Sequence, residues 1–288
     1  MTIDSTIESL RLQAGRARDA VRVAARRNRS DRPLPDFVIL GAQKAGTSSL
    51  YARLAAHPRV LPALRKEVHF FDTGPADRPD RYRAFFPTTR ERATVEHDLG
   101  APVLTGEATP YYLSHPAAPA RARSVVPDAR LIAVLRDPVA RAVSGYHHAV
   151  RFGNERRPIE VALDPVNEER LANVADEAWY DEASSPARLR GYFARGRYAE
   201  QLERWWAHYP REQLLVVETA GLRAGDAHVQ VLEFLGLDES TAAAVTPDRN
   251  VGSYAPPPLA VTDRLAAYFA PHNERLFTLL GERWDWAA

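Results

Sequence analysis

The sequence predicts an α/β fold, in which one domain has a central, mostly parallel β-sheet with helices on both faces. Three short apolar runs, at 37–40, 131–135 and 214–217, have the length and composition of strands buried on both faces. Segments with helical periodicity separate these runs. Strands that alternate with helices in this way favour a parallel sheet that is covered on both sides.

The order of the predicted elements places the domain boundaries. Residues 1–35 form a basic N-terminal helix or arm that Pro33 and Pro35 close, and the main domain is expected over 36–288. Residues 153–190 are polar and lack a clear period, so we interpret them as an insertion or lid within that domain. A short strand is expected at 102–104, and helices are expected at 50–55, 139–150, 196–209, 227–235 and 262–280.

The charge balance excludes a large electrostatic field. The chain of 288 residues has 38 Lys and Arg against 37 Asp and Glu, a formal net charge of +1, so any anion site must be built locally and no nucleic acid partner is expected. Arginines gather at 8–32, where a solvated helix or loose arm is favoured over a contact with an acidic surface.

Cysteine usage and hydropathy bear on location. The chain has no cysteine, which excludes disulfides, thiolate metal sites and cysteine nucleophiles and fits a reducing cytoplasm. No apolar stretch approaches the roughly 20 residues that span a bilayer, so no transmembrane segment is expected. Asp4 and Glu8 interrupt the N-terminus where a secretory signal would be apolar. We therefore expect a cytoplasmic protein.

A glycine-containing loop joins the first predicted strand to a helix, over residues 41–49. The N–H groups and the dipole of a helix N-terminus favour an anion, Gly41 and Gly46 allow a tight turn, and Lys44 adds a positive charge. In a nucleoside-triphosphatase loop, lysine follows the second glycine directly. Thr47 occupies that position here, so the loop predicts a phosphate site that differs from that of a triphosphatase.

A second anion anchor is predicted at the end of the strand 131–135. Arg136 follows that strand at the edge where α/β sheets bind ligands, and Ser144 lies about two helical turns further on. A guanidinium and a hydroxyl suit a terminal phosphate. The alternative for Arg136 is an ion pair with Asp137, and Arg141 is expected to face solvent or an internal acid.

Residues 66–72 combine charged groups with two aromatic anchors. Glu67 is our candidate general base, because a partly buried glutamate can have a raised proton affinity, and His69 is a rival or helper. No metal site is predicted, since His147 and His148 are adjacent and diverge on a helix. Aromatic side chains are candidates to line an acceptor cleft, although core packing is the simpler role of the tryptophans: Tyr111, Tyr112, Trp205 and Trp206.

These segments together resemble the PAPS-dependent sulfotransferase family, where PAPS is 3′-phosphoadenosine 5′-phosphosulfate. The resemblance is closest to the branch of the heparan sulfate glucosaminyl sulfotransferases and their bacterial relatives. It spans about residues 36 to 286. The matching motifs are residues 41–50 with His57 and Pro58, then 66–72, 106–112, 136–146, 196–202 and 234–237.

The resemblance implies a P-loop-type domain and a role for each matched residue. The 5′-phosphosulfate would be held by Lys44, Ala45, Gly46, Thr47, Ser48 and Ser49. Arg136 and Ser144 would hold the 3′-phosphate, and Glu67 would be the base. Lys44 would also stabilise the departing phosphate oxygen. The product would be adenosine 3′,5′-bisphosphate, and no metal is required.

The chain also departs from this family at two places. Ala108 stands where the heparan-type relatives usually have lysine, and Lys66 is the candidate to replace its charge. Their cofactor-clamping loop carries a disulfide, whereas residues 249–254 lack cysteine; Arg249 and Ser253 are expected to touch the nucleotide. The acceptor stays open among small molecules, lipids and saccharides. The alternatives are a P-loop kinase or nucleotide hydrolase and a non-catalytic nucleotide-binding protein.

Overall fold

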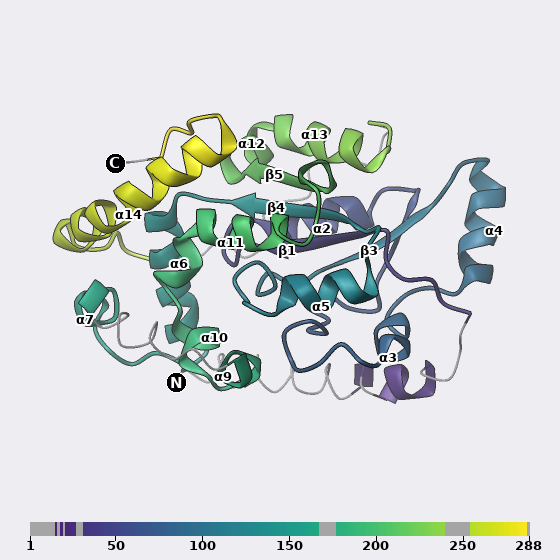
Figure 1. The fold of residues 1–288 in the computed structure, drawn as a ribbon, viewed down its shortest axis with the longest axis horizontal. Helices are drawn as coiled ribbons and strands as arrows, with labels where there is room; N and C mark the ends of the chain where they lie inside the picture. The colour runs from purple at the N-terminus through teal and green to yellow at the C-terminus, as the bar shows by residue number, and fades with distance from the viewer. Residues whose placement is uncertain are drawn as a thin grey trace.

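A five-stranded parallel sheet forms the centre of the molecule. The computed structural model describes residues 15, 18–19, 21–26, 31–166, 177–239 and 254–286. The strand order is β2-β3-β1-β4-β5, and all the pairings are parallel (Figure 1). The strands are β1 (Phe37–Gly41), β2 (Val60–Pro62), β3 (Leu104–Ala108), β4 (Arg130–Leu135) and β5 (Leu214–Glu218).

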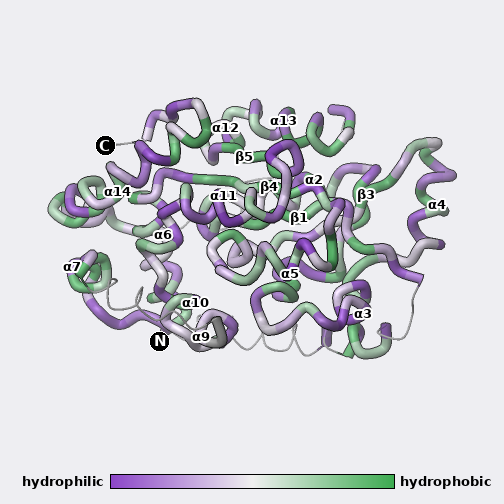
Figure 2. The backbone as a smooth tube through the Cα atoms, viewed as in Figure 1, coloured by the Kyte–Doolittle hydropathy of each residue, from purple (hydrophilic) through white to green (hydrophobic). Residues whose placement is uncertain are grey.

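The central strands are apolar because both of their faces are covered. Every residue of β1 is buried, as are Leu131 to Leu135 of β4. The larger of two core clusters contains the apolar residues of β1, most of β4 and apolar residues of α2, α11 and α13, and the smaller one joins α6 to the first half of α14. The hydropathy colouring follows the same pattern, with hydrophobic segments concentrated along the inner strands (Figure 2).

Helices cover the sheet and extend beyond its two ends. In Figure 1, α5 and α11 lie in front of the strands and α2 lies behind them, while α14 and α4 mark opposite ends of the molecule. The α-helices are α2 (Thr47–Ala55), α3 (Pro79–Arg83), α4 (Thr89–Leu99), α5 (Ala118–Val125), α6 (Pro138–Arg151), α7 (Ile159–Ala162), α9 (Glu177–Asp181), α10 (Pro186–Arg190), α11 (Tyr198–Trp206), α12 (Thr219–Ala224), α13 (Asp226–Leu235) and α14 (Leu259–Leu280). Two 3₁₀ turns are η1 (Ala194–Gly196) and η2 (Arg211–Gln213).

The predicted fold class is confirmed, while one strand was placed too early. The expected strand at 102–104 lies instead at Leu104–Ala108. The polar side chains of Thr105 and Glu107 concealed it, yet both are completely buried and hydrogen-bonded. The short strand β2 and the helices α4, α5 and α12 were not predicted, because their sequences lack a long apolar period.

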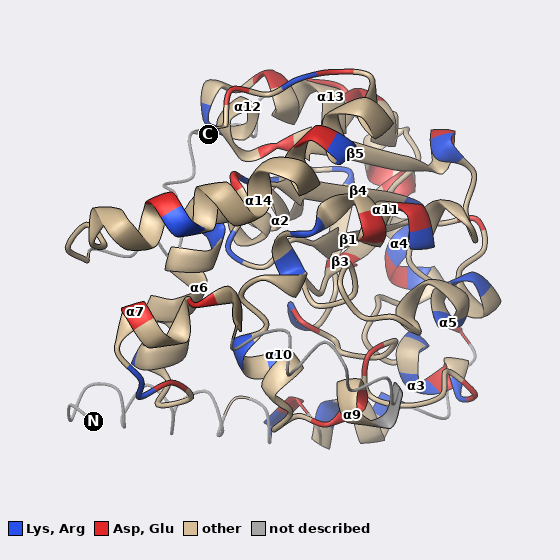
Figure 3. Cartoon of the chain, turned by 60° about the vertical axis from the view of Figure 1, so that its left-hand side comes forward, with Lys and Arg blue, Asp and Glu red and all other residues tan. Residues whose placement is uncertain are grey.

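The segment 153–190 contains short helices rather than one regular element. α7, α9 and α10 lie in it, and α10 packs against α6. In the described part of the arm, residues 21–26 are helical and Val23 is buried in the core cluster. Acidic and basic positions are interspersed over the helices (Figure 3). No helix in the described ranges has both the length and the hydropathy to cross a bilayer.

Candidate active site

The loop between β1 and α2 has the backbone of an anion cradle. Gly41 cannot carry a side chain, because an added Cβ would lie 2.7 Å from Leu113 Cβ and 2.9 Å from the Pro110 carbonyl oxygen. Gly46 has a φ of 98° and immediately precedes α2, with no side chain capping the helix. The N–H groups of Thr47 and Ser48, at the first two positions of α2, have no acceptor within the helix, whereas Ser49 N–H donates to the Gly46 carbonyl oxygen at 3.0 Å. The backbone is suited to an anion.

Lys44 lies within this loop and next to other cations. Its φ of 70° turns the backbone so that its carbonyl oxygen accepts a hydrogen bond of 3.1 Å from Arg136 Nη1. Burial lowers the pKa of Lys44, and the positive charges of Arg136, Arg151 and Lys66 lower it further. Like charges gathered at one loop favour a bound polyanion, which would offset their mutual repulsion.

Thr219, the first residue of α12, connects the loop to the end of β4. Thr219 Oγ1 lies 2.7 Å from the Ala45 carbonyl oxygen and 2.9 Å from the Leu135 carbonyl oxygen, so its one hydroxyl hydrogen is shared between the two acceptors. Asp137 caps α6 by accepting N–H groups of Val139 and Ala140, so it has a role other than the considered ion pair with Arg136. Sequence reasoning missed Thr219, because one threonine after a strand carries no distinctive signal.

The helix α6 places the other residue of the predicted second anchor. Ser144 is only 5% exposed on this helix, two turns after Arg136. Of the two environments expected for Arg141, solvent was wrong: its side chain is buried and donates to the Tyr192 carbonyl oxygen, and its charge also acts on Asp137. Its long stem and fork of donors reach a backbone acceptor across the helix interface, which the sequence does not reveal.

The catalytic candidate Glu67 is held at the carboxyl end of β3. Its N–H donates to the Ala108 carbonyl oxygen at 2.9 Å, and its φ of 60° is in the left-handed region. Lys66 Nζ lies 3.0 Å from Glu67 Oε1, and His69 Nε2 lies 3.7 Å from Oε2. Burial would raise the pKa of Glu67, but His69 and Lys66 outweigh it and the pKa lies well below its ordinary value. The expected rise in proton affinity was wrong for this reason.

A buried carboxylate supports the segment that carries Glu67. Glu107 accepts hydrogen bonds from the hydroxyls of Thr109 at 2.6 Å, Tyr112 at 2.9 Å and Tyr82 at 3.0 Å. Two of these hydroxyls in turn accept backbone N–H groups, Tyr112 from Phe70 at 2.8 Å and Thr109 from His69 at 3.4 Å. Glu107 thus holds the 67–72 segment indirectly, through the hydroxyls of Thr109 and Tyr112.

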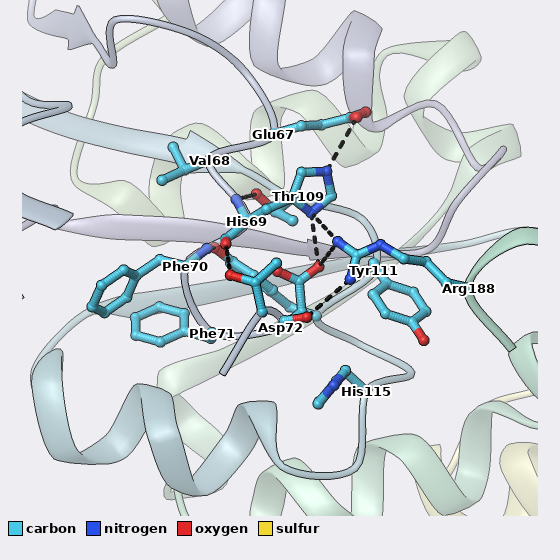
Figure 4. A network of polar contacts seen from close by, with 12 residues as sticks. Glu67, Val68, His69, Phe70, Phe71, Asp72, Thr109, Tyr111, His115 and Arg188 are labelled. Atoms are coloured by element: carbon cyan, nitrogen blue, oxygen red, sulfur yellow. Dashed lines mark hydrogen bonds and ion pairs between the residues drawn. The ribbon is translucent and has the colours of Figure 1, made fainter. Parts of the chain in front are cut away.

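His69 joins Glu67 to an aspartate and an arginine (Figure 4). Its Nδ1 lies 2.7 Å from Asp72 Oδ2 and 2.9 Å from Arg188 Nη2, and Arg188 Nη2 also lies 2.9 Å from the same carboxylate oxygen. Burial lowers the pKa of His69, but the carboxylates of Asp72 and Glu67 outweigh it and the net shift is upward. Asp72 and Arg188 were not predicted as site residues, because Arg188 comes from a segment without a clear pattern.

Other residues at the site also escaped prediction. Burial, with a contribution from Lys44, lowers the pKa of His148 to about 4, and Glu67 acts on the same imidazole in the opposite direction. A neutral imidazole therefore lies near the phosphate loop and the candidate base. Arg195 donates to Gln43 Oε1 in the loop and to carbonyl oxygens of α10. Both residues lie far along the chain from the loop motifs.

A cavity of about 110 Å³ opens beside Tyr111. Tyr111 is the member of the predicted aromatic set that lines it, while Tyr112 and Trp205 are completely buried in the core. Its other large side chains are Trp179, Tyr180, Arg195, Arg197, Glu200 and Arg204. The cavity combines aromatic surface with positive charge, so a flat polar molecule would fit its chemistry.

The structure brings most of the predicted site residues together at one edge of the sheet. In the loop, Ala45, Thr47 and Ser49 are buried, whereas Lys44, Gly46 and Ser48 are partly accessible. Arg249 and Ser253 lie outside the described residues. Within the described ranges, no group of three or more His, Asp or Glu side chains is arranged to hold a metal ion.

Comparison with known proteins gives a family match and several similar proteins. The family model described as "Sulfotransferase domain" matches residues 34–246. The human bifunctional heparan sulfate N-deacetylase/N-sulfotransferase 3 is 30% identical over 281 residues, which cover 86% of this chain and 30% of that protein. The human heparan sulfate glucosamine 3-O-sulfotransferase 3B1 is 33% identical over 206 residues, which cover 71% of this chain and 46% of that protein. The chain therefore spans less than half of the length of these relatives.

A solved structure shares the architecture. The sulfotransferase from Alicyclobacillus acidocaldarius is 29% identical, with a TM-score of 0.62, and the match covers 88% of this chain and 98% of that chain.

Glu107→Gln tests whether Glu107 holds the 67–72 segment in place. An amide has one acceptor oxygen in place of two, so at least one of the three hydroxyls loses its acceptor. We expect a loss of unfolding free energy of about 1–3 kcal/mol and faster hydrogen exchange at the amides of His69 and Phe70. Glu212→Gln, at an exposed position, is the control and should leave both quantities unchanged. Unaltered hydrogen exchange at these two amides in Glu107→Gln would contradict the role of Glu107 in holding the 67–72 segment.

Proposed function

The chain belongs to the sulfotransferase family, and on that premise we propose that it transfers a sulfuryl group from PAPS to a hydroxyl or amine of an acceptor. One observation carries the proposal. The Arg136 guanidinium donates to the carbonyl oxygen of Lys44, so the two anchors inferred for the two ends of one nucleotide lie against each other. A bisphosphorylated adenosine is the size of ligand that both could bind.

The residues present fit a donor of this kind. The left-handed backbone at Lys44 and Gly46 and the uncapped start of α2 provide N–H donors for a 5′-phosphosulfate. Lys44, Thr47, Ser48 and Ser49 would complete that grip, and Arg136 and Ser144 would hold the 3′-phosphate. PAPS supplies the sulfuryl group and leaves as adenosine 3′,5′-bisphosphate, while the acceptor oxygen or nitrogen forms the new bond to sulfur.

Glu67 is the proposed general base of this reaction. It would take the acceptor proton as the new bond to sulfur forms, because an attacking oxygen becomes strongly acidic along that path and a weak carboxylate base suffices. Lys66 and His69 contact the two carboxylate oxygens and fix their direction. The ammonium of Lys44 would stabilise the charge that develops on the departing phosphate oxygen. Lys66 pairs with Glu67, so we do not assign it the role of the lysine absent at Ala108.

The acceptor is proposed only as a class. By their names, one of the relatives above is an N-sulfotransferase of heparan sulfate and the other is a glucosamine 3-O-sulfotransferase of heparan sulfate. A saccharide is therefore a first choice to test, beside small molecules and lipids with a ring that suits the cavity near Tyr111. An acceptor screen with labelled PAPS and mass spectrometry for an added sulfonate would identify it.

Nucleotide selectivity separates this proposal from a P-loop kinase or hydrolase. In calorimetric titrations, adenosine 3′,5′-bisphosphate should bind tightly without magnesium, because Arg136 and Ser144 suit a 3′-phosphate that ATP lacks. Magnesium-ATP should bind at least tenfold more weakly, since Thr47 replaces the lysine that a triphosphate loop uses. A preference for magnesium-ATP would overturn the proposal.

Glu67→Gln separates chemistry from donor binding. With an acceptor from the screen, the variant should lose about 10²–10⁴-fold in kcat, whereas its affinity for adenosine 3′,5′-bisphosphate stays nearly intact. Lys44→Ala, measured in parallel, should lower both kcat and the affinity for adenosine 3′,5′-bisphosphate.

Because the pKa of Glu67 lies below its ordinary value, the wild-type rate should not fall as the pH drops through the usual range of a glutamate. Full activity of Glu67→Gln at saturating acceptor would show that another group is the base. Donor binding without turnover in the wild type would favour the non-catalytic alternative.

A further inference from the structure

Arg188 reaches the catalytic segment from a distant helix. It lies on α10, 116 residues after Asp72, and its side chain is 11% exposed. Its Nη1 donates to the Asp72 carbonyl oxygen at 2.9 Å, and its Nη2 donates to Asp72 Oδ2 at 2.9 Å. One guanidinium therefore grips both the backbone and the side chain of a single residue, which is a specific geometry for arginine.

An aromatic ring and hydrogen bonds to α10 hold Arg188 in this position. Its guanidinium lies over the Tyr111 ring, 4.7 Å from the centroid, and Arg195 lies over the same ring at 4.9 Å. Arg195 also donates to the carbonyl oxygens of Ala187 and Arg188, and Ser185 caps the N-terminus of α10. The helix that delivers Arg188 is thus anchored at both ends.

Asp72 requires a neutralising partner. Its side chain is completely buried, and its Oδ1 has no hydrogen-bond partner among the residues that the structure describes. Its Oδ2 is shared between His69 Nδ1 and Arg188 Nη2. Because a buried carboxylate without a compensating charge is costly, Arg188 and His69 must supply that charge between them.

The contact of His69 with Asp72 determines which imidazole nitrogen faces Glu67. A carboxylate oxygen accepts hydrogen bonds, so the 2.7 Å contact implies that His69 Nδ1 carries a hydrogen directed at Asp72. The opposite nitrogen, Nε2, then faces Glu67 Oε2. Arg188 donates to the same Asp72 oxygen, so this carboxylate is shared between the imidazole and the guanidinium.

From this geometry we propose that Arg188 is a positioning residue for sulfuryl transfer: by binding Asp72 it sets the direction and charge of His69 against Glu67. The orientation of His69 against Glu67 then depends on the contact between Arg188 of α10 and Asp72. This inference rests on the proposed function for its effect on rate, but its effect on His69 is independent of any turnover.

The charges around His69 give the direction of the expected change. Glu67 and Asp72 face it from its own segment, Arg188 faces it from α10, and Glu107 acts on it from β3. Arg188 is the cation that lowers the pKa of His69. Without Arg188, Asp72 has only the imidazole as a partner, so the pKa of His69 should move upward.

The test compares Arg188→Gln with Arg190→Gln, which removes the same charge from the same helix. His69 is followed by nuclear magnetic resonance in histidine-labelled protein, with its signal assigned through His69→Gln. We expect the titration of His69 to shift to higher pH in Arg188→Gln and to stay as in the wild type in Arg190→Gln. With PAPS and an identified acceptor, Arg188→Gln should lose about tenfold to a hundredfold in kcat with KM for PAPS within about twofold.

Arg188→Lys is a second variant, which separates loss of the positioning contact from a failure of Arg188→Gln to fold. Lysine keeps the charge but not the fork of donors, so kcat should lie between those of wild type and Arg188→Gln, and binding of adenosine 3′,5′-bisphosphate should be retained. An unchanged His69 titration in Arg188→Gln, or an equal loss of kcat in Arg190→Gln, would overturn the proposal. A shifted titration in a protein that transfers no sulfuryl group would keep the positioning role of Arg188 and remove the proposed function.

Discussion

The parallel pairing of β1 with β3 on one side and β4 on the other is the constraint on which the site depends. Ile39 pairs with Ala108, and Gly41 pairs with Ala133. Parallel strands end at the same edge of the sheet, and that edge is where α/β proteins bind their ligands. The phosphate loop leaves β1 there, the Ala108 carbonyl oxygen holds Glu67 there, and Arg136 leaves β4 there. Three segments that are far apart in sequence thus meet at one edge of the sheet.

Strain and buried polarity complete the site around this edge. Lys44, Glu67 and His69 all have positive φ values, a conformation that costs non-glycine residues of the order of 1–3 kcal/mol each. Such backbones persist only where the surroundings fix them. Here Arg136 binds the carbonyl oxygen of Lys44, while the hydroxyls held by Glu107 bind the N–H groups beside Glu67. The buried polar groups therefore serve to fix side-chain direction at the cost of an apolar core.

The sequence was sufficient for the fold class and for the residues that occupy short local motifs. The apolar runs of β1, β4 and β5 and the glycine spacing of the loop are local signals, and the structure places Lys44, Glu67 and Arg136 at one edge as expected. It was insufficient where tertiary contacts decide. β3 was misplaced because its sequence contains polar residues that are buried in the structure. The pKa of Glu67 is lowered rather than raised, because Lys66 and His69 outweigh the effect of burial. Arg188 was missed because its segment has no helical or strand period in the sequence. Such effects depend on contacts across many residues, which no local pattern encodes.

The central claim is that the anchors at Lys44 and Arg136 grip opposite ends of one nucleotide. The most direct test is a calorimetric comparison of adenosine 3′,5′-bisphosphate with adenosine 5′-monophosphate, which differ only in the 3′-phosphate. We expect Arg136→Gln to lose about tenfold to a hundredfold in affinity for the bisphosphate, as for charge-assisted hydrogen bonds, and clearly less for the monophosphate, for which Arg136 acts only through the Lys44 carbonyl oxygen. Lys44→Ala should weaken the binding of both nucleotides. Equal losses for the two nucleotides in Arg136→Gln would contradict it, because Arg136 would then not recognise the 3′-phosphate.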